Sequence, residues 1–320
     1  MRPPCTALST VAALAVLAAG RPAVATAAQS VPPVASFHVV VAPGESLHVV
    51  AAGRGTPVVL VPGLFGCAYG FRHLLDRLPA EGYRAIVIEP LAIGGSPRPE
   101  HADYSLTAQS DRLAEAIRRL ETGPVIVVAH SVSASTALRL ALRHPAAVRA
   151  IVLLDGGPME SAATKGFRRA MTYVPWVKWL GGMKRLKPRI RHDLIASSAD
   201  SAWITGTVLD AYTAGAASDL DGTLKAYLRM ADAREPERLA PALHQLRVPL
   251  GLLVGAAPHQ GGIPADQIRL LAREIPQFSL DSVPHAGHYL FEESPEAVDA
   301  AIHRADRSAA AVALGREAQP

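Results

Sequence analysis

The sequence has little of several features that mark particular classes of protein. It contains two cysteines among 320 residues, which excludes a disulfide framework or a cysteine-rich zinc site. Aromatic residues make up 5%, so the apolar share of 49% depends mainly on Ala, Val and Leu. The 32 basic and 28 acidic side chains nearly balance, and a net charge of +4 does not indicate nucleic-acid binding unless it clusters. The composition is that of a folded globular chain.

The N-terminal segment, residues 1–27, is predicted to be a secretory signal peptide. Arg2 supplies a positive start, and Val11–Ala19 form an apolar core of nine residues. A membrane anchor would need roughly 20 apolar residues, about twice that length. Small residues between Ala23 and Ala27 offer a cleavage site. We therefore expect a secreted or periplasmic protein.

Beyond a linker at 28–36, short apolar runs alternate with amphipathic stretches. Two runs flank a Pro-Gly pair and predict a hairpin, 37–41 and 47–52. Later runs lack polar alternation, as expected for strands covered on both faces: 58–61, 85–88, 125–129, 150–154, 249–254 and 278–283. Helical patterns lie between them: 106–120, 136–143, 265–274 and 296–304. The alternation predicts an α/β fold with a doubly wound, mostly parallel sheet.

The alternation of strand and helix stops after Asp155. From 156 to 247 the sequence has helix-like pieces broken by Gly and Pro, so we expect a helical lid. The lid would separate two parts of the core, 37–155 and 248–307. The Ala-rich tail, 308–320, is expected to be flexible.

The expected lid carries a basic stretch. Nine basic and no acidic residues lie from Lys165 to Arg191, interleaved with aromatic and aliphatic ones. We favour an apolar face that roofs a pocket for a hydrophobic substrate, with a solvated basic face outside. Weak contact with an anionic lipid surface is the alternative. No motif for nucleic-acid binding accompanies the charge.

A strand, a sharp turn and a helix surround Ser131. The strand 125–129 runs directly into Ser131, and a helical pattern follows at once. A tight turn of this kind exposes a serine Oγ and aims backbone N–H groups at developing negative charge. The usual pattern is G-x-S-x-G, and Ala129 and Ser133 make this a relaxed version of it. A serine that only caps the helix is the alternative.

A second Gly-containing turn follows the buried strand at 58–61. Leu64 in the segment P-G-L-F-G is the candidate for one oxyanion-hole donor, and the N–H of Val132 is the candidate for the other. The alternative is that the glycines only turn the chain. Nearby Cys67, the one thiol that a mature chain would keep, has no partnered base and is expected to be a buried small residue.

The candidate general base lies after the last predicted strand. His288 in the loop P-H-A-G-H would reach the carboxyl edge of the sheet above the serine, and His285 is the reserve. Two histidines alone do not make a metal site, and no further ligand stands at a recognisable spacing.

These segments together resemble the alpha/beta-hydrolase superfamily, in its serine-nucleophile branch with a lid. The motifs are P-G-L-F-G at 62–66, I-G-G-S at 93–96, A-H-S-V-S at 129–133 and G-H-Y-L-F-E-E-S-P-E at 287–296. The resemblance implies Ser131 as nucleophile and His288 as catalytic histidine. Serine at the elbow argues against the dehalogenases and epoxide hydrolases of the family, whose nucleophile is aspartate.

The sequence departs from the family at the acid. Pro258 stands where relatives commonly carry the carboxylate. Some relatives place it one strand earlier, which here corresponds to Asp155 in L-L-D-G-G. Asp155 is therefore the candidate acid, with Asp266 or a dyad without a carboxylate as alternatives.

These observations predict an exported serine hydrolase that cleaves a carboxylic ester or related small hydrophobic acyl compound. No metal or organic cofactor is required for this chemistry. Cleavage of a carbon–carbon or amide bond on the same scaffold is the enzymatic alternative. A non-catalytic binding protein that kept the fold is the other, because the usual acid is absent and the elbow is relaxed.

Overall fold

The structure is a computed structural model that describes residues 34–163, 168 and 182–317. These residues belong to the compact unit Val31–Pro320. The predicted signal peptide, most of the linker and most of the basic stretch lie outside the described residues.

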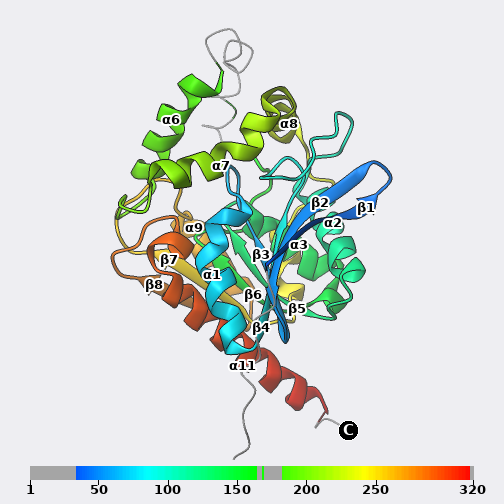
Figure 1. The fold of residues 1–320 in the computed structure, drawn as a ribbon. Coiled ribbons are helices and arrows are strands. Elements are labelled where there is room, and N and C mark those ends of the chain that lie inside the picture. The colour runs from blue at the N-terminus through cyan, green and yellow to red at the C-terminus, as the bar shows by residue number, and fades with distance from the viewer. Residues whose placement is uncertain (1–33, 164–167, 169–181, 318–320) are drawn as a thin grey trace, which may run out of the picture. The chain divides into compact units, whose positions relative to one another are not determined.

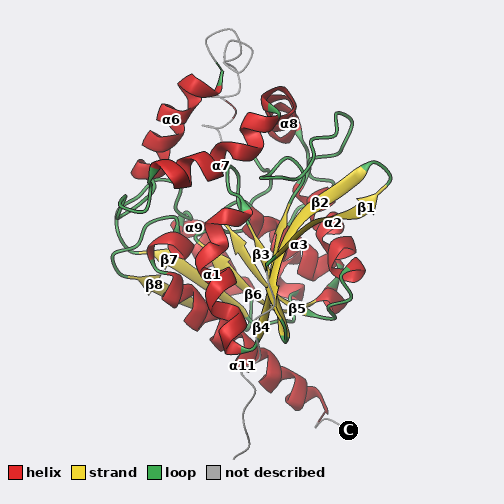
Figure 2. Ribbon diagram, in the orientation of Figure 1, coloured by secondary structure: helices red, strands yellow, loops and turns green. Residues whose placement is uncertain are grey.

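An eight-stranded sheet forms the centre of this unit (Figure 1, Figure 2). Its spatial order is β1-β2-β4-β3-β5-β6-β7-β8. The β1–β2 and β2–β4 pairs are antiparallel, and all pairs from β4–β3 to β7–β8 are parallel. The strands are β1 (Ala35–Ala42), β2 (Glu45–Gly53), β3 (Thr56–Val61), β4 (Tyr83–Glu89), β5 (Val125–His130), β6 (Val148–Leu154), β7 (Leu250–Gly255) and β8 (Phe278–Val283). The predicted α/β fold with a mostly parallel sheet is confirmed.

Helices cover both faces of the sheet. One face carries α1 (Arg72–Arg77), α10 (Leu290–Glu293) and α11 (Pro295–Glu317), and the other carries α2 (Leu106–Arg119), α3 (Ser133–Arg143) and α9 (Ala265–Glu274). Short 3₁₀ turns complete the layers at η1 (Ala68–Phe71), η2 (Leu78–Glu81) and η3 (Pro145–Ala147). This is the doubly wound arrangement that alternating strands and helices favour.

The two faces have separate apolar cores. On β3, Val59 and Val61 pack with α2 and α3, whereas Val58 and Leu60 pack with α1 and α11. All four side chains are fully buried, which explains why these strands lack polar alternation. Burying each such side chain contributes roughly 1.5–3 kcal/mol to folding, so the central strands are held firmly in place.

A helical insert, residues 156–247, separates β6 from β7. Its described part contains α6 (Met183–Ala196), α7 (Gly206–Ser218), α8 (Leu220–Asp232) and η4 (Ala240–Gln245), and no strand. Among the described residues, no helix has the length and apolar character to span a bilayer.

The end of the chain differs from our expectation. α11 continues to Glu317, so the segment from 308 to 317 is helical, which the sequence analysis did not predict. Ala-rich sequence has the highest intrinsic helix propensity, and Ala309 still packs against the core.

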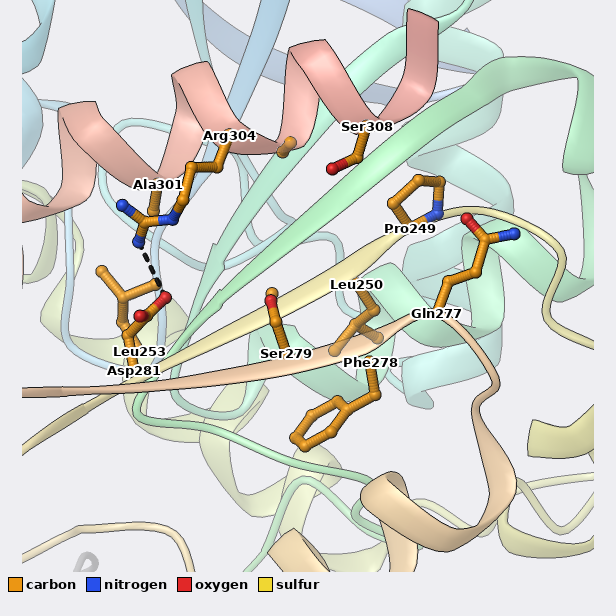
Figure 3. A pocket seen from close by; sticks show the side chains of 12 residues that line it. Pro249, Leu250, Leu253, Gln277, Phe278, Ser279, Asp281, Ala301, Arg304 and Ser308 are labelled. Atoms are coloured by element: carbon orange, nitrogen blue, oxygen red, sulfur yellow. Dashed lines mark hydrogen bonds and ion pairs between the residues drawn. The ribbon is translucent and has the colours of Figure 1, made fainter. Parts of the chain in front are cut away.

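A surface groove runs between α11 and the strands β7 and β8 (Figure 3). Its volume is about 240 Å³. Across it, Arg304 on α11 donates from Nη2 to Oδ2 of Asp281 at 2.7 Å.

Candidate active site

The register of β5 and β6 brings two of the predicted residues together. His130 pairs with Leu154 across the two parallel strands. The next residues, Ser131 and Asp155, therefore leave the carboxyl edge of the sheet side by side. The Ser131 N–H donates to the Leu154 carbonyl at 3.0 Å, and the Asp155 N–H donates to the Leu253 carbonyl of β7 at 2.8 Å.

Ser131 lies on a strained turn. Its φ is 55°, in the left-handed region that costs a non-glycine residue about 1–2 kcal/mol. Two glycines make room for it: a Cβ on Gly156 would lie 2.2 Å from the Ser131 carbonyl oxygen, and one on Gly63 would lie 3.0 Å from the Ser131 Cβ. α3 begins two residues later at Ser133, so its N-terminal end faces the turn. The sharp strand–turn–helix that the sequence predicted is present.

His288 is fixed by hydrogen bonds on three sides. Its Nδ1–H donates to Oδ2 of Asp155 at 2.7 Å, and both side chains are buried. Its backbone N–H donates to the Ser197 carbonyl at 2.8 Å, and its carbonyl accepts from Nε2 of His130 at 3.1 Å. With the proton on Nδ1, the other ring nitrogen carries the lone pair that a general base needs.

Asp155 has the environment of a carboxylate that stays ionised. Burial by itself would raise its pKa, but hydrogen bonds and charge from His288 and His259 outweigh burial and lower the pKa below its usual range. The geometry does not favour the alternatives for the acid. Asp266 is exposed in the first turn of α9, and a dyad would leave the 2.7 Å contact of Asp155 unexplained. The reserve base, His285, is exposed.

Two backbone N–H groups are available beside the turn. Leu64 and Val132 line one small cavity of about 30 Å³. Within the described chain, neither N–H donates a hydrogen bond to another backbone or side-chain group. Gly66 closes the first loop by donating to the Gly63 carbonyl at 3.0 Å. Free N–H groups on converging loops are what an oxyanion hole requires.

The His130 ring packs against the ring of His288, the candidate base. Burial, and then the proximity of His288, lower the pKa of His130 well below its usual range, so its ring is neutral. The two rings lie 4.5 Å apart between centroids, and Tyr289 and Phe291 enclose the His130 ring from other sides. The sequence analysis assigned no role to His130.

A second imidazole contacts the same carboxylate, and the sequence analysis missed it. His259, in the loop after β7, has Nε2 at 2.7 Å from Oδ2 of Asp155 and Nδ1 at 2.7 Å from the Ala257 carbonyl oxygen. The available signal was its place directly after Pro258, where relatives carry the acid. Two sets of described residues bring three potential metal ligands within 4.8 Å of one another: Asp155, His259 and His288, and Glu81, Asp299 and His303.

Comparisons with known proteins identify the fold. A family model for the alpha/beta hydrolase fold matches residues 56–178. The 2-(acetamidomethylene)succinate hydrolase of Mesorhizobium japonicum is 25% identical over 76% of this chain and 85% of its own length. The sn-1-specific diacylglycerol lipase ABHD11 of Mus musculus is 24% identical over 75% of this chain and 77% of its own. The crystal structure of Cfl2 from Burkholderia cenocepacia superposes with a TM-score of 0.70 at 21% identity, covering 84% of this chain and 94% of that one.

The chain has the alpha/beta hydrolase fold. The resemblance stated from the sequence motifs is thereby confirmed, and the protein is a hydrolase of the alpha/beta fold.

The helical insert of this alpha/beta hydrolase is tied to the loop that carries the base. The Ser197 carbonyl at the end of α6 accepts from His288, and the N–H groups of Ala199 and Asp200 donate to Oε2 of Glu293 at 2.7 and 3.1 Å. Further along, Oε1 of Glu292 accepts from Tyr212 of α7 at 2.8 Å. The described part of the insert therefore packs directly on the site.

The small cavity of the hydrolase lies between the core and the insert. Its lining is mainly apolar and includes Met230 of α8. The polar groups in the lining bond elsewhere: the Tyr104 hydroxyl donates to the Pro99 carbonyl at 2.9 Å, and the Gln109 amide exchanges hydrogen bonds with the Leu91 backbone. The cavity thus offers little to a charged group and suits an uncharged one.

Cys67 takes no part in this arrangement. Burial and the nearby charge of Glu89 raise the pKa of the Cys67 thiol to about 12, so the thiol keeps its proton. Its Sγ lies 3.8 Å from the Ala211 carbonyl oxygen. The expectation of a buried small residue is confirmed.

Proposed function

We propose that the protein is an exported serine hydrolase that cleaves a carboxylic ester through an acyl-enzyme. The observation that carries the proposal is the 2.7 Å hydrogen bond from His288 to Asp155, which leaves the other ring nitrogen free. The register of β5 and β6 supplies Ser131 at the same edge.

In the proposed reaction, Ser131 Oγ attacks the ester carbonyl while its proton passes to Nε2 of His288. Asp155 stabilises the imidazolium, and the N–H groups of Leu64 and Val132 hold the oxyanion. The tetrahedral intermediate collapses, the C–O bond to the alcohol breaks, and His288 returns the proton to the departing oxygen. His288 then deprotonates a water that attacks the carbonyl of the acyl-enzyme. The bond between the acyl carbon and Ser131 Oγ breaks, His288 returns the proton to Oγ, and the acid product leaves.

The cavity beside Leu64 and Val132 supports a short, uncharged acyl group. Its volume of about 30 Å³ is far below that of typical small-molecule sites, which favours the shortest acyl groups. An ester is the preferred bond because an alcohol is a better leaving group than an amine, and His288 can return the one proton that it needs. Among the relatives, the diacylglycerol lipase is named for an ester substrate. The 2-(acetamidomethylene)succinate hydrolase is named for an acetamido compound, so such a substrate is the alternative.

Labelling with a fluorophosphonate probe tests the nucleophile. The wild type should be labelled, and Ser131→Ala should lose labelling while Ser135→Ala, four residues along the chain in the first turn of α3, should keep it. A wild type that never reacts would favour a binding protein that kept the fold.

A series of p-nitrophenyl esters tests the acyl pocket. Acetate and butyrate should be cleaved at least tenfold faster, by kcat/KM, than palmitate, and Met230→Ala should narrow that ratio by enlarging the cavity. If amide or carbon–carbon substrates turn over while every ester fails, the bond is assigned wrongly.

Export is tested on the full chain expressed in a bacterial host. We expect protein outside the cytoplasm whose N-terminus is close to Ala28, and we expect retention of the uncleaved chain when Ala25 and Ala27 are both replaced by Phe. The same preparation tests the basic stretch, because binding to vesicles with anionic lipid would support a membrane-contacting lid.

A further inference from the structure

The two ring nitrogens of His259 both face oxygen acceptors. Nδ1 lies 2.7 Å from the Ala257 carbonyl oxygen, and Nε2 lies 2.7 Å from Oδ2 of Asp155. Neither acceptor can donate, because a carbonyl has no proton and Asp155 is held ionised. A neutral imidazole has one N–H and would leave one of these contacts as a repulsive pair of lone pairs. The imidazolium form satisfies both.

A metal ion is the other way to satisfy such a cluster, and the distances argue against it. Ligand atoms about 2.0–2.1 Å from a tetrahedral zinc lie roughly 3.3 Å apart. Here Oδ2 of Asp155 is 2.7 Å from Nε2 of His259 and 2.7 Å from Nδ1 of His288. These are lengths of charge-assisted hydrogen bonds, so protons fill the positions that a metal would take.

The loop after β7 is shaped to hold this histidine. A Cβ on Gly262 would lie 2.9 Å from Nε2 of His259, and one on Gly261 would lie 3.4 Å from the His288 ring. The His259 side chain is 7% exposed, and its ring stacks on that of His288 with centroids 6.1 Å apart. Among the described residues, the titratable side chains in contact with His259 are Asp155 and His288.

We propose that His259 is a cationic positioning residue: it donates to Asp155 from the loop in which relatives carry the acid, and so offsets part of the charge that Asp155 presents to His288. The proposal rests on the proposed function, because it concerns how His288 is tuned as a base. With a neighbouring cation, His288 gains a proton less readily, so the free base persists to lower pH. The hydrolase therefore keeps its activity further into the acidic range than Asp155 and His288 alone would allow.

The pH dependence of fluorophosphonate labelling tests this without knowledge of the substrate. His259→Gln keeps an amide donor for Asp155 and removes the charge, so the acidic limb of the labelling rate should move up by about one pH unit. On that limb the variant should label about tenfold more slowly, with little change on the alkaline plateau. His192→Gln, an exposed histidine on α6, is the matched control and should leave the limb in place.

Nitrogen-15 NMR of the histidine rings gives a second readout on the wild type, which needs no variant to fold. We expect both nitrogens of His259 to carry protons at neutral pH, and the signal to be assigned by its loss in His259→Gln. A single protonated nitrogen would overturn the proposal.

Two further results separate the possible failures. If labelling depends on Ser131 but the limb of His259→Gln coincides with that of the wild type, the role of His259 is wrong and the serine hydrolase stands. If the wild type never labels, the proposed function fails while the NMR result still decides the charge on His259. Micromolar zinc that displaces the His259 proton signals, with recovery on chelation, would assign the cluster to a metal and overturn the proposal.

Discussion

The carboxyl edge of the sheet and the groove beside α11 differ in backbone strain and in buried charge. The groove (Figure 3) is the larger, about 240 Å³ against about 30 Å³ for the cavity at Leu64 and Val132. None of its lining residues, all within the described chain, has a positive φ, and its ion pair is half exposed. At the carboxyl edge, Ser131 and Asp155 both have positive φ, and Asp155 is a buried charge. Backbone strain and buried charge therefore identify the functional region better than the volume of a groove or cavity does.

The largest expected effect is on turnover when the buried carboxylate is removed. Asp155→Asn keeps the shape of the side chain but cannot orient His288 in the right tautomer or stabilise its cation, so kcat should fall by about 10⁴-fold. Ester hydrolysis with a folded-state check by circular dichroism measures this. Asp281→Asn in the groove is the matched control and should stay within twofold of the wild type. Equal losses in the two variants would erase the contrast between the regions.

Two glycines, one at the carboxyl edge and one in the groove, extend the comparison to the free energy of unfolding. A Cβ on Gly156 would press against the backbone of Ser131 at 2.2 Å, whereas one on Gly251, which lines the groove, would meet Oγ of Ser279 at an ordinary 3.5 Å. We expect Gly156→Ala to lower the free energy of unfolding by roughly 2–3 kcal/mol and Gly251→Ala to change it by less than about 1 kcal/mol. Urea denaturation measures both. Similar values for the two variants would mean that the turn is not tightly packed.

Acidification sharpens the contrast in a different way. The pKa of Asp155 is lowered because the contacts from His288 and His259 outweigh burial. A lowered folded-state pKa stabilises the fold above the ordinary value, about 3.9, and that contribution is lost as pH falls through the folded pKa. The wild type should therefore lose its stability advantage over Asp155→Asn between about pH 5 and pH 3. An advantage that grows with acid, measured by urea denaturation across this range, would reverse the sign.

The smallest effect is expected at the ion pair of the groove. Arg304→Ala removes the contact with Asp281, but the two side chains are 46% and 43% exposed. An exposed pair contributes at most about 1 kcal/mol, so we expect a small change in the free energy of unfolding and none in kcat. A large loss of activity here would make the groove a functional region.

The fold was predictable from the sequence because the hydrophobic pattern of each strand and helix lies within one short segment of the chain. Each central strand is a short Val- and Ile-rich run, and each crossover helix has an apolar stripe, so strands such as β3 and β5 follow from the sequence. The end of α11 was not predictable in the same way. An Ala-rich segment fits either a tail or a helix, and the packing of Ala309 on the core decides for the helix.

The candidate site was predictable where one residue follows a strand directly. Ser131 and Asp155 come immediately after β5 and β6, so their placement needs the topology alone. His259 lies four residues beyond β7, and its contact with Asp155 depends on the path of an irregular loop. His130 lies in the A-H-S-V-S segment without a role of its own there, and His259 belongs to no motif. Only coordinates reveal that His288 and His259 both contact Asp155 and that the His130 ring lies beside that of His288.

The pairing of His130 with Leu154 also has a consequence for when activity appears. The nucleophile and the acid are neighbours through sheet register, but the base arrives from residue 288, more than 130 positions along the chain from Asp155. Contacts between such distant segments form slowly, because closing the long intervening loop costs conformational entropy before the contacts stabilise the fold. During refolding, recovery of the helical signal should therefore precede recovery of catalysis. On the ribosome, competence has to wait until nearly the whole polypeptide has emerged.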